Sequence, residues 1–124
     1  MRLVQIAQHA DDLERAAAFY EQLTGATPRG MFDPPGLLFF DLDGVRLLLE
    51  RGAPPSVLYL AVADIDAAVE RVRGLGVPVE SEPHVIFEHL DTRLGPAGTA
   101  EWQAFFRDSE GNLVGLVEQR PIEG

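Results

Sequence analysis

The chain contains no cysteine and no lysine among its 124 residues. The absence of cysteine excludes disulfides, thiolate nucleophiles, and zinc or iron–sulfur sites built on cysteine. All ten residues of the Lys and Arg class are arginine. The absence of lysine therefore excludes a Schiff base, a P-loop lysine and a lysine general base.

Long apolar runs are also missing. No stretch approaches the roughly 20 apolar residues that a membrane-spanning helix needs, and the first residues lack a basic stretch followed by an apolar core. We therefore expect a soluble, cytoplasmic protein that does not interact with membranes. A chain of 124 residues can form one compact domain with its own core, so we expect a single domain over residues 1–124.

Basic charge is scarce relative to acidic charge. The formal net charge is -10, with 20 Asp and Glu residues against 10 Arg. Because nucleic-acid binding depends on basic groups that neutralise phosphates, we expect no nucleic-acid partner. The acidic field favours cationic ligands, although acidic surfaces commonly serve solubility alone.

What the sequence does contain is a repeat. An apolar strand followed by an Ala-rich helix begins at Val4 as VQIAQHADDLERAAAFYEQLTG and again at Val57 as VLYLAVADIDAAVERVRGLG. Each copy ends in a similar hairpin strand, DGVRLLL from Asp43 and EGNLVGL from Glu110. Because a short repeated unit cannot usually bury its apolar face alone, we expect the copies to pack together or against a partner chain.

Capping residues and apolar spacing predict one helix in each copy. The first is expected to open at Asp11, with a Glu three residues later, and to end near Gly25. The second is expected to open at Asp64 and to end at Gly74 or Gly76. The expected buried stripes are Leu13, Ala16, Ala17, Tyr20 and Leu23 in the first helix, and Ile65, Ala68, Val69, Val72 and Leu75 in the second.

Turn residues and alternation predict the strands. They are expected at residues 3–9, 27–32, 37–42, 45–51, 57–62, 77–89 with an interruption near Pro83, 101–107 and 112–119. Residues 52–56 are expected to link module one, about residues 1–52, to module two, about residues 57–124. Residues 90–100 are expected to form a mobile loop.

Alternation also predicts which side chains face away from the helices. In the strand of residues 45–51, Val45, Leu47 and Leu49 form an apolar row that suits the helix side. The residues expected on the opposite faces are Gln5, Arg46, Leu48, Glu50, Val57, Tyr59, Ala61 and Gly115. His84 and His89 are five residues apart in one strand, so alternation predicts opposite faces and no ligand pair.

The doubled module, the DL…FY stretch of the first helix and the ending FFRDSEGNLVGLVE strongly resemble the vicinal oxygen chelate superfamily. This superfamily includes glyoxalase I, extradiol dioxygenases, fosfomycin-resistance enzymes and bleomycin-binding proteins. The resemblance implies an α+β fold of two tandem βαβββ modules that form a curled, cup-shaped mixed sheet with helices on the convex side, commonly in a homodimer. It specifies the activity poorly, because one scaffold hosts many chemistries.

The resemblance also implies where a metal would bind. Metal-dependent members draw ligands from the first and last strands of each module. The first strands give Gln5 and Val57, and the last strands give Leu48 in module one and Gly115 in module two, where glyoxalase-like members carry Glu. Only Gln5 can coordinate a metal, whereas a catalytic ion needs about three protein ligands. The resemblance therefore implies a metal-free small-molecule binding protein, similar to the members that sequester bleomycin or other antibiotics, with no cofactor and no catalytic residue. Whether the chain is an enzyme stays open.

The predicted ligand site has polar and aromatic lining and an apolar floor, the usual composition of small-molecule sites. Its lining is predicted to be Gln5, Arg46, Glu50, Tyr59, His84 and Trp102, and its floor Leu48, Val57 and Gly115. A cationic or planar aromatic ligand would suit this site. For three of these residues another interpretation stays open: Arg46 could form a surface ion pair with Glu50, Trp102 could pack in the core, and His84 could be an exposed strand histidine.

Two other functions stay open. One is a divalent-metal-dependent lyase, isomerase or dioxygenase of the glyoxalase type, in which Gln5, Glu50 and His84 hold one ion in a rearranged site. The other is a domain that serves only assembly.

Overall fold

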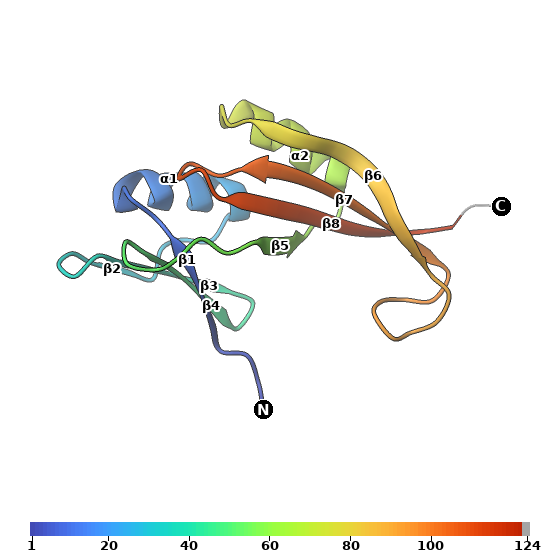
Figure 1. Cartoon of the computed structure of the whole chain (residues 1–124), viewed down its shortest axis with the longest axis horizontal. Coiled ribbons are helices and arrows are strands. Elements are labelled where there is room, and N and C mark those ends of the chain that lie inside the picture. The colour runs from blue at the N-terminus through green and yellow to red at the C-terminus, as the bar shows by residue number, and fades with distance from the viewer. Residues whose placement is uncertain (123–124) are drawn as a thin grey trace. The chain divides into compact units, whose positions relative to one another are not determined.

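The computed structural model of the chain describes residues 1–122, which divide into two compact units (Figure 1). Unit 1 contains residues 1–56 together with residues 108–112, and unit 2 contains residues 57–107 and 113–122. The second repeat therefore contributes a short segment, residues 108–112, to the unit that the first repeat forms.

Unit 1 contains one helix and one four-stranded sheet. Its elements are β1 (Gln5–His9), α1 (Leu13–Thr24), β2 (Gly30–Phe32), β3 (Leu37–Leu42) and β4 (Val45–Glu50). The strand order is β1-β4-β3-β2, in which β1 runs parallel to β4 and the other neighbours are antiparallel. Helix α1 contacts β3 and β4, and the Tyr20 ring lies 6.3 Å from the Phe40 ring on that side of the sheet.

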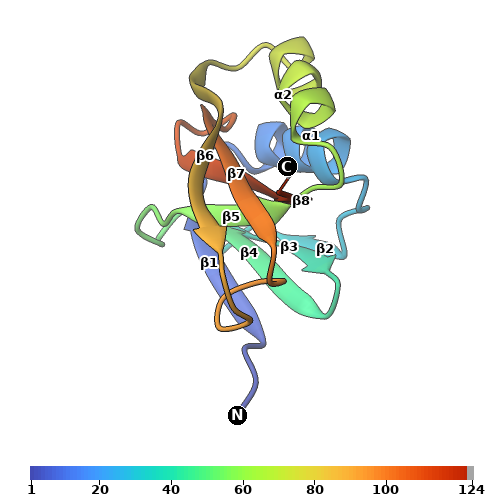
Figure 2. The same ribbon diagram turned by 90° about the vertical axis from the view of Figure 1, so that its right-hand side faces the viewer.

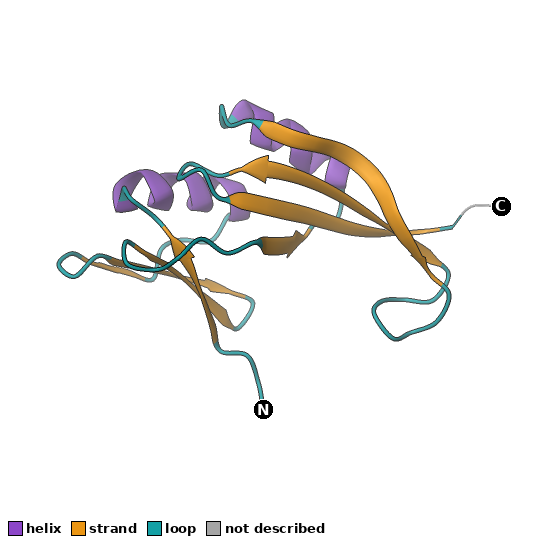
Figure 3. Ribbon diagram, viewed as in Figure 1, coloured by secondary structure: helices purple, strands orange, loops and turns teal. Residues whose placement is uncertain are grey.

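Unit 2 repeats this plan. Its elements are β5 (Leu58–Ala61), α2 (Ile65–Gly74), β6 (Val79–His89), β7 (Thr99–Arg107) and β8 (Leu113–Pro121). The strand order is β5-β8-β7-β6, with β5 parallel to β8, and α2 contacts β6, β7 and β8 (Figure 3). Figure 2 shows β6 and β7 running side by side to a loop at residues 90–98.

The predicted α+β fold of two βαβββ modules is confirmed. One detail differs, because the strands form two separate four-stranded sheets rather than one sheet curled into a cup. Within residues 1–122 neither helix combines the length and the apolar sequence that crossing a membrane would require.

The N-cap of α1 is Asp12, not the predicted Asp11. The Asp12 side chain accepts a hydrogen bond from the Arg15 backbone N–H at 3.0 Å, and Gly25 ends the helix with a φ of 78°. Such a positive φ favours glycine, which has no Cβ to clash. The buried side chains of α1 are Leu13, Ala16, Phe19, Tyr20 and Leu23, so Phe19 takes the place that was predicted for Ala17.

Helix α2 follows the prediction at both ends. Asp64 accepts from the Ala67 backbone N–H at 3.1 Å, and the helix ends at Gly74 with Leu75 as its C-cap. Ile65, Val69 and Val72 are buried, whereas Ala68 and Leu75 are only half-buried.

The strands lie close to their predicted ranges, and proline explains two differences. β2 begins at Gly30 rather than residue 27, and β6 begins at Val79 rather than residue 77. Pro28 and Pro78 have no N–H to donate to a ladder, so the strands start after them. The register of β6 shifts on both sides of Ser81 and again after Val85, which confirms an interruption near Pro83.

Candidate functional site

Two aromatic side chains lie side by side on the face of unit 2 that points away from α2. Tyr59 in β5 and Phe105 in β7 both pair in register with Gly115 of the strand between them. The two rings meet edge to face, with their centroids 5.8 Å apart. The Tyr59 residue is 57% exposed. We call Tyr59, Phe105 and Gly115 the aromatic shelf.

The two rings occupy the space beside Gly115. A Cβ at this position would lie 2.9 Å from Cε1 of Phe105 and 2.9 Å from Cδ2 of Tyr59. Contacts this short are essentially never made by real Cβ atoms, so any larger residue would require the rings to move. The glutamate that the resemblance implies for glyoxalase-like members at the position of Gly115 therefore has no room here unless these two rings move.

A buried polar cluster lies on the same face of unit 2. The Oε1 atom of Glu101 accepts a hydrogen bond from Nε2 of His89 at 2.9 Å and from Nε2 of Gln119 at 3.3 Å. The Oε2 atom accepts from Nε2 of Gln103 at 2.7 Å. Glu101 and His89 are buried, at 8% and 4% exposure. We call Glu101, His89, Gln103 and Gln119 the Glu101 cluster.

The Glu101 side chain is held as a carboxylate. Burial alone would raise its pKa, but the hydrogen bonds from Gln103, His89 and Gln119 favour the charged form, and the net pKa is lowered. The sequence predictions do not include this cluster. Alternation in EWQAFF places Glu101, Gln103 and Phe105 on one face, so the signal was present in the predicted strand.

Trp102 lies on the opposite face from the aromatic shelf. Its ring is 4.7 Å from the guanidinium carbon of Arg120, and Arg120 donates to Asp66 of α2 at 2.7 Å. Trp102 and Arg120 therefore point toward the helix, whereas Gly115 and Phe105 point away from it. The structure does not bring Trp102 together with Tyr59 and Gly115.

The other two predicted residues of unit 2 are exposed. His84 pairs in register with Gln103, and its Nδ1 lies 2.8 Å from the carbonyl oxygen of Glu82. Val57 precedes β5 and is exposed. His84 thus lies beside a member of the Glu101 cluster, on an irregular part of β6.

In unit 1 the structure brings Gln5 and Arg46 together. They are register partners in β1 and β4, and Nε of Arg46 donates to Oε1 of Gln5 at 2.9 Å. Leu48 is buried beside Ala7, and Glu50 is the register partner of His9. Arg46 and Glu50 are four residues apart in one strand, roughly 13 Å, so the structure favours an Arg46–Gln5 contact over the Arg46–Glu50 ion pair.

The residues at the four superfamily metal positions do not fit a divalent ion. Leu48, Val57 and Gly115 have no donor atom, and the amide oxygen of Gln5 already accepts from Arg46. Glu50 cannot complete a site with Gln5, because four strand residues separate their register positions, again roughly 13 Å. Among residues 1–122, no three His, Asp or Glu side chains gather as a metal-binding group.

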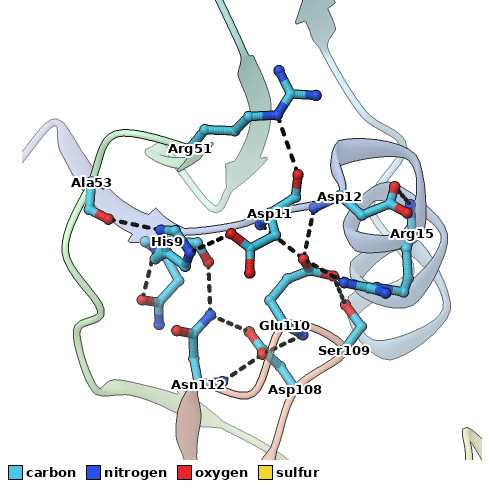
Figure 4. Close-up of polar contacts among 11 residues, drawn as sticks. His9, Asp11, Asp12, Arg15, Arg51, Ala53, Asp108, Ser109, Glu110 and Asn112 are labelled. Atoms are coloured by element: carbon cyan, nitrogen blue, oxygen red, sulfur yellow. Dashed lines mark hydrogen bonds and ion pairs between the residues drawn. The ribbon is translucent and has the colours of Figure 1, made fainter.

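Unit 1 also contains a dense polar network around the start of α1 (Figure 4). The Oε1 atom of Glu110 accepts from the backbone N–H groups of Asp11 and Asp12, each at 2.9 Å. Nε and Nη2 of Arg15 donate to the same carboxylate at 2.8 and 3.0 Å. Burial alone would raise the pKa of Glu110, but these bonds and one from Ser109 lower it to about 2.

His9 lies in the same network. Its Nδ1 is 3.0 Å from the carbonyl oxygen of Ala53, and its Nε2 is 2.9 Å from Oδ1 of Asp11. Both neighbours only accept hydrogen bonds, so both ring nitrogens donate in the imidazolium form. Burial lowers the pKa of His9, but the bonds to Asp11 and Ala53 outweigh it and the net pKa is raised.

An open pocket of about 440 Å³ lies beside this network. Its lining residues are Asp12, Leu13, Glu14, Met31, Asp33 and Arg51. Arg51 donates two hydrogen bonds to the carboxylate of Asp33, at 2.7 and 2.8 Å. Asp12 caps α1, so three charged residues of the pocket, Asp12, Asp33 and Arg51, already make contacts that stabilise unit 1.

The fold resembles that of several solved structures. TnmS3, an antibiotic binding protein from a Streptomyces species, is 23% identical with a TM-score of 0.72, and the match covers 97% of each chain. A lactoylglutathione lyase from Agrobacterium tumefaciens is 24% identical with a TM-score of 0.68, covering 94% of this chain and 92% of the lyase. At these identities the likeness shows the fold and leaves the activity open.

The sequence comparison extends over nearly the whole chain. Residues 2–116 match the family described as the Glyoxalase/Bleomycin resistance protein/Dioxygenase superfamily. The search of curated proteins finds no match. The matched range contains every helix and strand up to the first residues of β8, so the chain belongs to the Glyoxalase/Bleomycin resistance protein/Dioxygenase superfamily.

Proposed function

We propose that this chain is a metal-free small-molecule binding protein that captures its ligand stoichiometrically, as the bleomycin-resistance type of this superfamily does. The observation that carries the proposal is the filled space at Gly115. Where metal-dependent members place a glutamate, this chain has no side chain, and the Tyr59 and Phe105 rings lie within 2.9 Å of where one would begin.

The aromatic shelf indicates which class of ligand the protein would bind. Tyrosine and phenylalanine rings attract planar aromatic molecules through stacking and edge-to-face contacts. The exposed Tyr59 ring and the polar Glu101 cluster together provide the mixed apolar and polar lining that small-molecule sites use. A planar aromatic antibiotic or other toxic metabolite, neutral or cationic, is the ligand class we propose.

A thermal-shift screen of planar aromatic antibiotics tests this proposal. A ligand present at 100 times its Kd stabilises the folded state by about 2.7 kcal/mol, which raises the melting temperature by several degrees. We expect such a shift in the native protein and a much smaller one in Tyr59→Ala. Because Tyr59 is exposed, this variant should still fold. The proposal fails if no compound raises the melting temperature, or if Tyr59→Ala keeps the full shift.

Metal content separates this proposal from the lyase, isomerase or dioxygenase alternative. The protein would be incubated with manganese, iron, nickel and zinc, dialysed, and examined by plasma mass spectrometry. We expect less than a tenth of an equivalent of each metal per chain. About one retained equivalent would overturn the proposal in favour of metal-dependent chemistry.

We further propose that the protein acts in the cytoplasm as a homodimer. The absence of a membrane-spanning helix among residues 1–122 is compatible with this location, and the superfamily resemblance suggests the dimer. Light scattering would show a particle of twice the chain mass, and a monomer would contradict the proposal.

A further inference from the structure

The Glu101 cluster fixes the orientation of two side-chain amides. A carboxylate can only accept hydrogen bonds, whereas a glutamine amide has an NH2 end that donates and a carbonyl end that accepts. Only the NH2 end of Gln103 or Gln119 can therefore face Glu101, as their distances of 2.7 and 3.3 Å show. The carbonyl oxygens of both amides must point elsewhere.

Those carbonyl oxygens are unused acceptors. No donor among residues 1–122 hydrogen-bonds to them, and no buried side-chain nitrogen or oxygen in that part of the chain lacks a partner. Neither oxygen is therefore fully enclosed by protein. Gln119 is exposed and Gln103 is half-buried. An N–H donor on a ligand could bind either oxygen without displacing a protein contact.

The charge of the cluster points to the same kind of ligand group. Glu101 is bound by His89, Gln103 and Gln119, and none of these is an arginine. Several other carboxylates in the chain pair with a guanidinium, as Glu110 does with Arg15. Among residues 1–122 the Glu101 carboxylate has no guanidinium partner, so its negative charge favours a positive group nearby.

The cluster lies within reach of a ligand on the aromatic shelf. Gln103 precedes Phe105 by two residues on the same face of β7, a separation of roughly 7 Å. Glu101 lies one further pair of residues away, roughly 13 Å from Phe105. A ring stacked on Tyr59 could therefore place a short side arm beside Gln103.

We propose that the Glu101 cluster is a specificity subsite that selects an ammonium or other N–H donor group carried on a planar aromatic ligand. Gln103 and Gln119 contact that group through their carbonyl oxygens, and Glu101 is the positioning residue that orients both amides. The inference rests on the proposed capture of a planar ligand by the aromatic shelf, and adds the chemistry of the ligand's side arm.

Two probes with the same ring and opposite charge test the subsite. 2-(1-Naphthyl)ethylamine is a cation at neutral pH, and 1-naphthylacetate is an anion of similar size. We would measure both Kd values by NMR titration of isotope-labelled protein. We expect the amine to bind at least about tenfold more tightly than the acetate.

The decisive variant is Gln103→Leu, which removes one acceptor and keeps the size of the side chain. We expect the amine to lose most of its advantage and the acetate to bind as before. Glu101→Gln should also reduce the preference for the amine, because the amides of residues 103 and 119 are then free to flip. Gln22→Leu, at an exposed position of α1 in unit 1, is the matched control and should leave both Kd values unchanged.

The possible outcomes distinguish the proposed subsite from the proposed capture of ligand by the aromatic shelf. Equal binding of amine and acetate, or a Gln103→Leu variant that keeps the full preference, overturns the subsite and leaves capture by the shelf standing. If neither probe binds at millimolar concentration, the proposed capture and the subsite both fail. If Tyr59→Ala weakens both probes and Gln103→Leu weakens only the amine, both inferences hold.

Discussion

Gly115 occupies a strand position at which an added Cβ would lie 2.9 Å from two aromatic side chains. Glycine in a strand usually costs stability, because its backbone is more flexible when unfolded. Here the missing side chain lets Tyr59 and Phe105 approach each other over the strand between them. Gly115 thus weakens the strand but leaves room for the two rings to form one aromatic surface.

We expect Gly115→Ala to destabilise the protein by about 1–3 kcal/mol, the usual cost of overpacking a close contact. Removing one ring should relieve the clash. The loss caused by Gly115→Ala should therefore be smaller in a Tyr59→Ala background, and the two substitutions should not be additive. Urea unfolding of the four chains of this double-mutant cycle measures the coupling.

Gly74 offers a matched control. It is the last residue of α2, and no atom lies within 4 Å of where its Cβ would be. Gly74→Ala should be neutral or stabilising by a few tenths of a kcal/mol, because alanine favours the helix. Equal losses at Gly74 and Gly115 would indicate a backbone effect and contradict the steric explanation.

At the scale of elements, each helix has its start fixed by a glutamate from the last part of the chain. The Glu110 carboxylate accepts the backbone N–H groups of Asp11 and Asp12 before α1, and Glu118 accepts that of Ile65 in α2 at 2.8 Å. The first N–H groups of a helix have no partner within it and carry partial positive charge. A carboxylate satisfies both requirements, so the repeat uses the same device twice.

Glu110→Gln should destabilise the protein by about 1–3 kcal/mol, the range for hydrogen bonds to a charged group. The native carboxylate has its pKa lowered from 4.5 to about 2. Its stabilisation is therefore complete above pH 4.5 and is lost as the pH falls toward 2. We expect native protein to lose stability through this range faster than Glu110→Gln, as measured by urea unfolding at several pH values.

Glu80→Gln is the control for this comparison. Glu80 is an exposed residue that pairs with Arg107 at 3.0 Å, and exposed pairs contribute little. Its substitution should change stability by less than about 0.5 kcal/mol and leave the acid dependence unaltered. An identical acid profile for native protein and Glu110→Gln would contradict the role assigned to Glu110.

The elements themselves were predictable because their signals are local. Apolar spacing placed both helices, and Asp43-Gly44 placed the turn between β3 and β4, which cover residues 37–42 and 45–50. The cap of α1 was mispredicted, because Asp11 and Asp12 are equally suitable as local residues. The choice depends on Glu110, about 100 residues away in sequence, which binds the N–H groups of both.

At the scale of the whole molecule, only part of the candidate site could be predicted from the sequence. The regular strands let alternation place Tyr59 and Gly115 on one face, and the structure confirms that they are neighbours. Trp102 was grouped with them although register puts it on the helix face, because the sequence does not show how β7 pairs with β8. The role of His89 was missed, since the register shifts in β6 break the alternation on which such an assignment depends.

The net charge of the whole chain should act on the ligand in addition to the Glu101 cluster. A formal charge of -10 attracts cations and repels anions over a distance of about 10 Å at 0.1 M salt. We expect higher sodium chloride to weaken binding of 2-(1-naphthyl)ethylamine and to strengthen binding of 1-naphthylacetate.

The Kd values of both probes should be measured from low salt to about 1 M, where screening acts within about 3 Å. These values separate the contribution of the net charge from that of the close contacts in the Glu101 cluster. The part of the amine preference that survives at high salt belongs to close contacts with Gln103 and Gln119, and should be absent in Gln103→Leu. If the whole preference disappears with salt in the native protein, the net charge alone accounts for the selection.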